Sequence, residues 1–181
     1  LDIIYEFDFL SSFGTFSYNH NEFAYPKLKK GDFYLEMEEA GHPLIDSVVR
    51  VDNDIIIDGH KQLLVITGAN MAGKSTFLRT VGVNMILALA GAVTCTKKMI
   101  ITPIELHTSI RTSDSVQKNE SYFFAELKRL KSIIDRMQAG ENLFIILDEM
   151  LRGTNSKDKH HGSESLIEQL IRLNGSGLIA T

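Results

Sequence analysis

The stretch of sequence that decides the fold is residues 63–76, which read L-L-V-I-T-G-A-N-M-A-G-K-S-T. The apolar run Leu63–Thr67 predicts a β-strand that is buried on both faces. Gly68–Ser75 then matches the pattern G-x-x-x-x-G-K-[ST] at every fixed position. A helix is expected from about Ser75 to Ala90. A strand, a glycine-rich loop and a helix in this order are the setting that a phosphate-binding loop requires, so a chance match is a poor explanation.

The residue types in this loop suit the binding of a nucleotide. Glycines at 68 and 73 let the backbone curl tightly, so that several N–H groups point at a polyphosphate. The start of the helix adds its positive dipole end. Lys74 is expected to reach the β- and γ-phosphates, and the Ser75 hydroxyl to coordinate Mg²⁺. The predicted nucleotide-binding residues are Gly68, Ala69, Asn70, Met71, Ala72, Gly73, Lys74, Ser75 and Thr76.

A second apolar run ends in two acids. Residues 143–147 read L-F-I-I-L and are followed by Asp148 and Glu149. Asp148 is expected to hold Mg²⁺ opposite Ser75, and Glu149 to polarise the attacking water as a general base. A pair of acids on an ordinary loop is the alternative. Their position about 75 residues after the phosphate loop favours catalysis, with Glu149 and Lys74 as catalytic residues of an ATPase.

The remaining pattern alternates strands with helices. Residues 1–20 have apolar residues at helical spacing and predict an amphipathic helix. Further strands are expected at 33–37, at 55–57 and from Leu178 onward, and a further helix at about 161–173. Buried strands alternating with helices predict an α/β fold with a mainly parallel sheet flanked by helices, which binds its ligand at the carboxyl ends of the strands.

The helix between the two apolar strands has a clear stripe. Its apolar residues follow gaps of four and three, which place them on one face, and Gly140 is a suitable C-cap. The residues of this stripe are Phe123, Leu127, Leu130, Ile134 and Met137. Lys128, Arg129 and Lys131 lie off the stripe and are expected to face solvent.

Composition limits the function classes. A length of 181 residues suits one domain, and a single cysteine, Cys95, rules out an internal disulfide and fits a reducing cytosol. The longest apolar stretch, 85–93, is about half of what a bilayer requires, so no membrane segment is expected. The net charge of −4 is unlike that of a domain that grips DNA alone. The sequence opens Leu1-Asp2-Ile3 without Met or a basic leader, so we expect a piece of a longer cytoplasmic protein.

Several motifs together resemble the MutS family of DNA mismatch-repair proteins. Residues 67–76, T-G-A-N-M-A-G-K-S-T, are similar to its phosphate loop T-G-P-N-M-x-G-K-S-T, of which the Asn-Met pair is typical. Residues 148–154 resemble its D-E-x-x-R-G-T segment, and residues 121–126 its S-T-F-x-x-E helix start. Gly41-His42-Pro43 and Asn53-Asp54 match upstream elements near the base and ribose. The resemblance covers about residues 30–181.

The resemblance implies a fold similar to the ABC ATPases and a Mg²⁺-dependent ATPase domain at residues 31–181, preceded at 1–30 by a helical linker to a further region. It implies homodimers with both nucleotides between the two domains, and Ser121 contacting the γ-phosphate held by the partner; an N-cap role for Ser121 is equally good chemistry. Gly153 and Thr154 would lie at that interface. The ATP cycle would be coupled to a dimer bound to mismatched or distorted double-stranded DNA through other domains, in a cytoplasmic, nucleoid-associated protein.

Differences from the family pattern leave alternatives open. Residues 114–120 and 153–158 depart from the usual forms, and the histidine expected after the final A-T would fall beyond Thr181. A divergent MutS paralogue that acts on other DNA structures is therefore one alternative, and a nucleotide-gated clamp that scarcely hydrolyses ATP is another. A transporter ATP-binding subunit would need an LSGGQ-type signature, and a small-molecule kinase an arginine-rich lid.

Several residues are expected to be structural. His160 and His161 are expected at the surface, because no ligand partner stands at metal-site spacing. Cys95 is expected to be buried. The residues expected in the core are Met85, Met99, Phe7, Phe9, Phe13 and Phe16; the alternative for the four phenylalanines is packing against a further domain.

Overall fold

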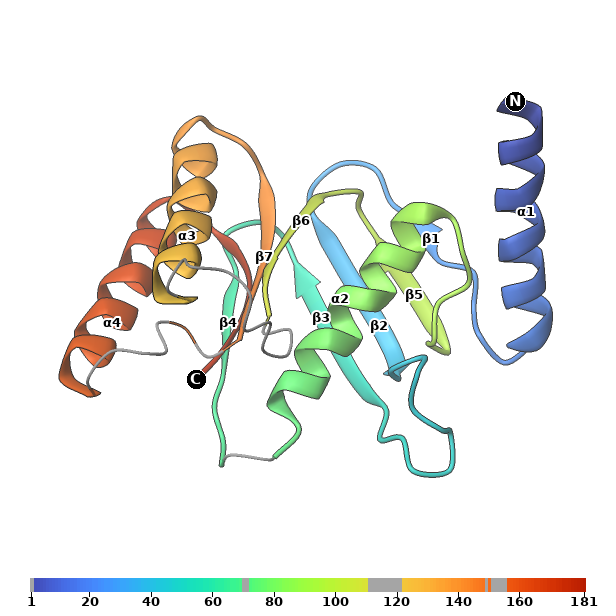
Figure 1. Ribbon diagram of the computed structural model, residues 1–181, viewed down its shortest axis with the longest axis horizontal. Coiled ribbons are helices and arrows are strands. Elements are labelled where there is room, and N and C mark those ends of the chain that lie inside the picture. Colours follow the sequence, from blue (N-terminus) through green and yellow to red (C-terminus); the bar gives the residue numbers. More distant parts are fainter. Residues whose placement is uncertain (1, 70–71, 111–121, 149, 151–155) are drawn as a thin grey trace. The chain divides into compact units, whose positions relative to one another are not determined.

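The computed structural model describes residues 2–69, 72–110, 122–148, 150 and 156–181 (Figure 1). The chain forms two compact units. Unit 1 comprises residues 1–58 and 83–103, and unit 2 comprises residues 59–82 and 104–181. One helix, α2 (Lys74–Ala90), is unbroken across the division, so its first half belongs to unit 2 and its second half to unit 1.

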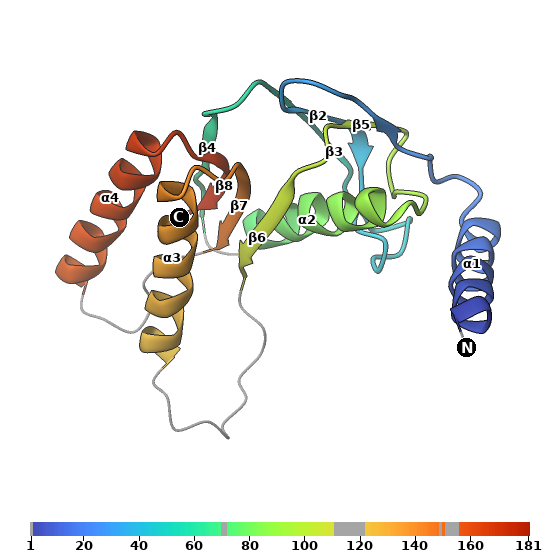
Figure 2. The same cartoon turned by 90° about the horizontal axis from the view of Figure 1, so that it is seen from above.

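Unit 2 contains a parallel sheet of four strands in the order β4-β8-β7-β6. The strands are β4 (Leu63–Ile66), β6 (Glu105–Ser109), β7 (Leu143–Asp148) and β8 (Ser176–Ala180). Helices α3 (Tyr122–Gln138) and α4 (Ser156–Arg172) lie side by side along it (Figures 1 and 2). The predicted α/β fold with a parallel sheet flanked by helices is confirmed.

The core of unit 2 forms on both faces of β7. Ile145 and Leu147 point to one face, where they pack with Leu130 of α3 and Leu170 of α4. Ile146 points to the other face and approaches Gly82 of α2 so closely that a Cβ built on Gly82 would lie 3.3 Å from its Cδ1. Helices on both sides of a parallel sheet explain why residues 143–147 are all buried.

The prediction that β4 is buried on both faces was wrong. Among the described strands this one is at the edge of its sheet, and the side chains of Leu64 and Val65, which point to opposite faces, are 38% and 47% exposed. An apolar run shows that a strand prefers burial. It does not show which strands will lie beside it.

The stripe predicted on α3 is partly correct. Of the predicted residues, Leu130 and Met137 are buried, Ile134 is only partly buried and Leu127 is 38% exposed. Ile133, which is not in the predicted stripe, is also buried. The side chain of Phe123 lies outside the described residues.

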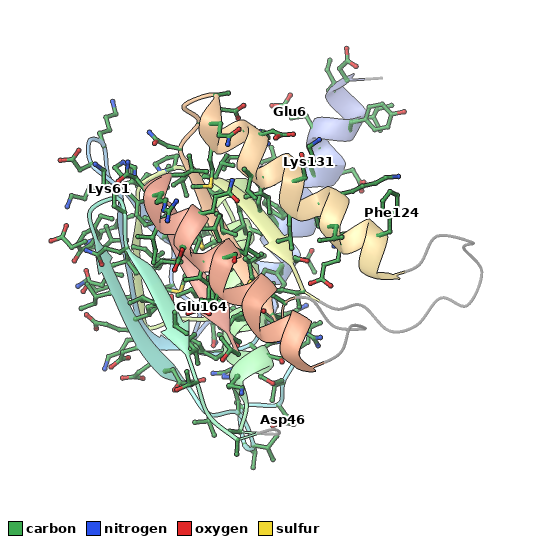
Figure 3. All side chains as sticks on the ribbon, turned by 90° about the vertical axis from the view of Figure 1, so that its left-hand side faces the viewer. Glu6, Asp46, Lys61, Phe124, Lys131 and Glu164 are labelled. Carbon is green, nitrogen blue, oxygen red and sulfur yellow. The ribbon has the colours of Figure 1, made fainter. Side chains whose placement is uncertain are left out.

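The ends of the helices follow their expected signals. Gly140, with φ of 87°, ends α3 and donates its N–H to the carbonyl of Met137, as predicted. Helix α4 begins at Ser156, five residues before its predicted start. The predicted start is too late because the first turns of the helix are polar and have no apolar periodicity. The cationic side chains of Lys128, Arg129 and Lys131 are exposed as expected, and Figure 3 shows Lys131 on the outer side of α3.

Unit 1 contains a second sheet, in the order β1-β5-β2-β3. Its strands are β1 (Lys27–Leu28), β2 (Tyr34–Ala40), β3 (Asn53–Asp58) and β5 (Lys98–Ile101). Strand β1 is parallel to β5, and the other pairs are antiparallel. Alternate side chains of the three longer strands are almost fully buried, namely Leu35, Met37, Ile57, Met99 and Ile101. The opposite face carries ion pairs, including that of Lys98 with Glu36 and Glu38.

The predicted N-terminal helix is present as α1 (Asp2–Asn19), but none of its residues is buried. Phe7 and Phe9 are 76% and 49% exposed, so the prediction that they belong to the core was wrong. Only Phe16 packs against a buried cluster of Phe23, Val93 and Cys95. Met85 and Met99 are buried as predicted.

None of the helices in the described part of the chain is long and apolar enough to cross a membrane.

One arginine of unit 2 joins α3 to β6 and to the turn that follows α3. The Arg136 guanidinium donates to both carboxylate oxygens of Glu105 at 2.7 Å and, through Nε, to Glu141 at 2.8 Å. It also donates to Nε2 of His107 at 2.6 Å. The hydrogen bonds from Arg136 to Glu105, followed by the one between His107 and Glu105, lower the pKa of Glu105 from 4.5 to about 2.

Glu105 should therefore make unit 2 sensitive to acid. A lowered pKa in the folded state means that the carboxylate stabilises the fold above pH 4.5, and that this contribution is lost as the pH falls toward about 2. We expect the Glu105→Gln variant to lose less stability than the wild type across this window, as measured by urea unfolding at a series of pH values. The matched change Glu6→Gln, on exposed α1, should leave the pH profile as it is; equal profiles for the wild type and Glu105→Gln would contradict the assignment.

Candidate functional site

The glycine-rich loop connects the carboxyl end of β4 with the amino end of α2. Gly73 has φ of 83°, a conformation that side chains with a Cβ rarely adopt. The amide of Phe77 donates to the Gly73 carbonyl at 2.9 Å, which begins the helix. The first-turn N–H groups of α2 therefore lack helical partners and point back toward the loop.

Lys74 places its charge at the carboxyl edge of the parallel sheet. Its Nζ donates to the carbonyl oxygen of Gly68 at 2.5 Å and to that of Thr181, directly after β8, at 2.7 Å. Both contacts are exposed. The ammonium group thus lies across the mouth of the loop. An anion in the loop can replace the two carbonyls as its hydrogen-bond partner.

Asp148 ends β7 at the same edge. The strand register aligns it with Ala180 of β8, and Ala180 with Ile66 of β4. Two strand spacings therefore separate Asp148 from the strand that leads into the loop, roughly 10 Å. The loop, Lys74 and the carboxylate consequently share one end of the sheet, where α/β folds bind ligands.

The carboxylate of Asp148 fits a bound cation. Its Oδ1 is buried and has no hydrogen-bond partner among the described residues. A buried carboxylate oxygen without a partner is costly, and carboxylate and hydroxyl oxygens are the ligands that Mg²⁺ prefers. Asp148 and the Ser75 hydroxyl in the first turn of α2 are therefore suited to hold Mg²⁺ beside a polyphosphate.

Comparisons with known proteins identify the family. The family model described as MutS domain V matches residues 64–181, which is more than half of the chain. The chain belongs to the MutS domain V family. It is thus an ATPase domain of the MutS family, and the predicted relationship is confirmed.

Individual relatives of this MutS domain agree with that result. It is 35% identical over 158 residues to the DNA mismatch repair protein MutS of Fusobacterium nucleatum, covering 83% of the chain and 17% of the relative. For MutS of Bacillus subtilis the identity is 32%, with coverage of 90% and 19%. The Endonuclease MutS2 of Thermus thermophilus is 29% identical, with coverage of 81% and 19%. The chain spans about a fifth of the length of these relatives.

Several predicted site residues of the MutS domain lie outside the described residues. They are Asn70, Met71, Ser121, Glu149, Gly153 and Thr154. Side chains at 160–161 are likewise not described, so the prediction of surface histidines stays a prediction. Among the described members of the motif, Gly68, Ala69, Ala72 and Gly73 lie between β4 and α2, and Lys74, Ser75 and Thr76 form the first turn of α2.

A buried amide in unit 1 was missed from the sequence. Asn84 of α2 is fully buried and donates to the Gly41 carbonyl at 3.0 Å, while its Oδ1 accepts from the Cys95 amide at 2.7 Å. It anchors the Gly41-His42-Pro43 turn to the helix that begins with Lys74. The feature of the sequence that could have identified Asn84 is its position as a single amide side chain in the otherwise apolar run 83–90. Burial raises the pKa of the Cys95 thiol to about 11, which agrees with the predicted structural role of Cys95.

A cavity of about 420 Å³ in unit 2 lies away from the phosphate loop. It is lined by Lys61, Leu143 and Ser176, which precede or begin β4, β7 and β8, and by Gln138 and Arg172 at the ends of α3 and α4. These residues occupy the amino edge of the parallel sheet, opposite to the edge at which Asp148 lies. The cavity is therefore no part of the nucleotide site.

Proposed function

We propose that this domain binds Mg²⁺–ATP at the carboxyl edge of the parallel sheet of unit 2 and hydrolyses it. The single observation that carries the proposal is the buried Oδ1 of Asp148, which has no hydrogen-bond partner among the residues that the structure describes and lies at the same sheet edge as the Lys74 ammonium group. The Lys74 ammonium can bind the phosphates of a nucleotide, and the Asp148 carboxylate at the same sheet edge can bind the metal ion that accompanies them.

Each residue has a separate task in this mechanism. The loop amides and Lys74 bind the β- and γ-phosphates, so that the Lys74 ammonium exchanges the carbonyls of Gly68 and Thr181 for phosphate oxygens. Ser75 and Asp148 would hold Mg²⁺, which would neutralise charge at the phosphates. Glu149 accepts a proton from the water that attacks the γ-phosphorus, and ADP leaves from the opposite side.

For the longer protein, we propose that two such domains pair with the nucleotides between them, with Ser121 contacting the partner's γ-phosphate and Gly153 and Thr154 at the interface. The cycle would then alter a dimer that holds mismatched or distorted double-stranded DNA through other parts of a cytoplasmic protein. Residues 1–30 would link the ATPase domain, 31–181, to those parts. The similarity to both MutS and Endonuclease MutS2 supports either classical mismatch repair or, as the second candidate, a paralogue that acts on other DNA structures.

The experiment that tests hydrolysis is the Glu149→Gln substitution. We expect turnover of ATP to fall by roughly 100-fold to 10,000-fold, because a general base contributes about that much, while calorimetry shows unchanged Mg²⁺–ATP affinity. Chelation of Mg²⁺ should abolish turnover in the wild type. The matched change Glu164→Gln on α4 should affect neither quantity.

Other outcomes favour the alternatives. Wild-type binding without measurable turnover would favour a nucleotide-gated clamp over an ATPase. Light scattering on the Glu149→Gln variant tests the pairing, because ATP should double the mass from 20.3 kDa; a mass that does not respond to ATP would contradict pairing of this chain.

A further inference from the structure

Helix α2 carries a fully buried amide side chain among apolar neighbours. Its buried apolar residues recur at helical spacing and are Leu78, Val81, Met85 and Ala88. Apolar burial is not directional, so such a stripe selects the buried face of the helix but sets its exact rotation and axial position only weakly. Asn84 stands beside this stripe and is buried completely. A buried amide requires hydrogen bonds, and hydrogen bonds have a definite geometry.

The Asn84 amide stands between two backbone segments of unit 1. Gly41 follows β2 and Cys95 precedes β5, which is antiparallel to β2, and the Gly41 N–H donates to the Cys95 carbonyl at 2.8 Å. In a hydrogen-bonded antiparallel pair the Cys95 N–H would donate back to the Gly41 carbonyl. Instead, the Cys95 N–H donates to Asn84 Oδ1 at 2.7 Å, and Asn84 Nδ2 donates to the Gly41 carbonyl at 3.0 Å. Both ends of the amide are therefore held by backbone.

The backbone that holds the amide is itself closely constrained. A Cβ on Gly41 would collide with the side chains of Arg50 and Asp52, which form an ion pair at 2.7 Å. Two residues earlier, Glu39 has φ of 49° and its N–H donates to Oδ1 of Asp54 at 2.7 Å. A residue other than glycine keeps this conformation only where its surroundings impose it. Asn84 is thus bonded to a part of unit 1 that has little freedom to move.

We propose that Asn84 is a positioning residue of the nucleotide site, which sets the rotation and axial position of α2 and so places Lys74 and Ser75 in its first turn. The inference rests on the proposed binding of Mg²⁺–ATP by these two residues. Helix α2 is continuous from Lys74 to Ala90, so its first turn follows any movement at Asn84. A shift of one residue in its register moves each side chain by about 1.5 Å along the axis and about 100° around it. A misplacement of about 1 Å can cost about 100-fold in rate.

Two substitutions of Asn84 separate positioning from packing. Asn84→Gln keeps the amide on a side chain that is one methylene longer, so the same backbone groups are bonded only if α2 moves. We expect kcat for ATP to fall by roughly 100-fold in a folded protein. Asn84→Leu keeps a branched, buried side chain without either hydrogen bond, and kcat should fall at least as far. A merely structural role predicts a kcat near that of the wild type for Asn84→Gln.

The matched control is Met85→Ala, at the next residue of the same helix. Met85 is buried completely, so its truncation leaves a cavity and should lower the urea concentration at which the protein unfolds. It removes no directional contact, and kcat at low temperature without urea should therefore stay near the wild-type value. Met85→Ala losing as much of kcat as Asn84→Gln would overturn the proposal, because loss of packing would then explain both variants.

A measurement without nucleotide separates this inference from the proposed function. Spin labels at positions 56 and 86 replace the exposed side chains of Ile56 in β3 and Ile86 in α2, which are 62% and 57% exposed and both belong to unit 1. The distance between the labels should be single and narrow in the wild type and in Met85→Ala, and it should shift or broaden in both Asn84 variants.

The outcomes then have separate meanings. Unchanged label distances in both Asn84 variants would overturn the positioning role, whether or not the wild type hydrolyses ATP. A wild type without turnover would contradict the proposed hydrolysis, and the label distances would still decide whether Asn84 positions α2. Turnover in the wild type with an equal kcat in Asn84→Gln and Asn84→Leu would leave the proposed function standing and overturn the role of Asn84.

Discussion

The Lys74→Ala variant is expected to bind Mg²⁺–ATP roughly 100-fold to 1,000-fold more weakly than the wild type. The Lys74 ammonium lies at the mouth of the loop, where it donates to the exposed carbonyls of Gly68 and Thr181. Removing it leaves the charge of the phosphates without its partner, a loss of about 3 to 4 kcal/mol for a close charge pair. Isothermal titration calorimetry measures the difference.

A matched variant separates this effect from damage to the fold. Lys131→Ala removes a lysine from the exposed side of α3 and should bind ATP as the wild type does. Both variants should unfold at nearly the wild-type urea concentration, because Lys131 is exposed and Lys74 is only half-buried, and substitutions outside the core usually change stability by about 0.5 kcal/mol. If Lys74→Ala binds ATP normally, the phosphate site lies elsewhere in the chain.

The Gly177→Ala variant is expected to lose at least about 3 kcal/mol of unfolding free energy. Gly177 is in the middle of the sheet of unit 2, and a Cβ on it would lie 2.0 Å from the carbonyl oxygen of Ile145 in β7. That oxygen is backbone in a buried strand, so neither strand can yield without opening the β7–β8 ladder. The φ of 157° is also one that side chains rarely adopt.

Urea unfolding checks this prediction, with Gly14→Ala as its control. Gly14 is within α1 and has nothing within 4 Å of its built Cβ, so alanine there should be neutral or stabilising by up to about 1 kcal/mol. A Gly177→Ala protein as stable as the wild type would show that β7 and β8 are not packed as closely as described.

The strongly patterned elements could be predicted from the sequence. The phosphate loop, α2 and β7 combine an unambiguous motif or apolar run with clear end signals, so local physics and tertiary packing agree. Strands β1, β5 and β6 were missed, because β1 has two residues and β6 reads E-L-H-T-S, which lacks the alternation of a half-buried strand. Their pairing depends on neighbours distant in sequence.

Burial was harder to predict than secondary structure. The apolar residues of α1 and β4 suggested core positions, yet periodicity reports what a segment prefers to bury and not whether a partner is present. Similarly, the acid at position 148 was predicted from its place after an apolar run, but the absence of a described partner for its Oδ1 could only be found in three dimensions. The roles of Glu149 and Ser121 stay predictions.

The unbroken course of α2 has a consequence for dissecting this domain. Unit 1 is assembled from two separate stretches of chain, and the junction of its second stretch with unit 2 falls between Gly82 and Val83, inside a single helix. Neither unit can be separated from the other without cutting α2. A cut between Gly82 and Val83 would leave two half-helices, one with Lys74 and the other with the buried amide of Asn84. Proteolysis within α2, or gene fragments that end there, should therefore give unfolded pieces.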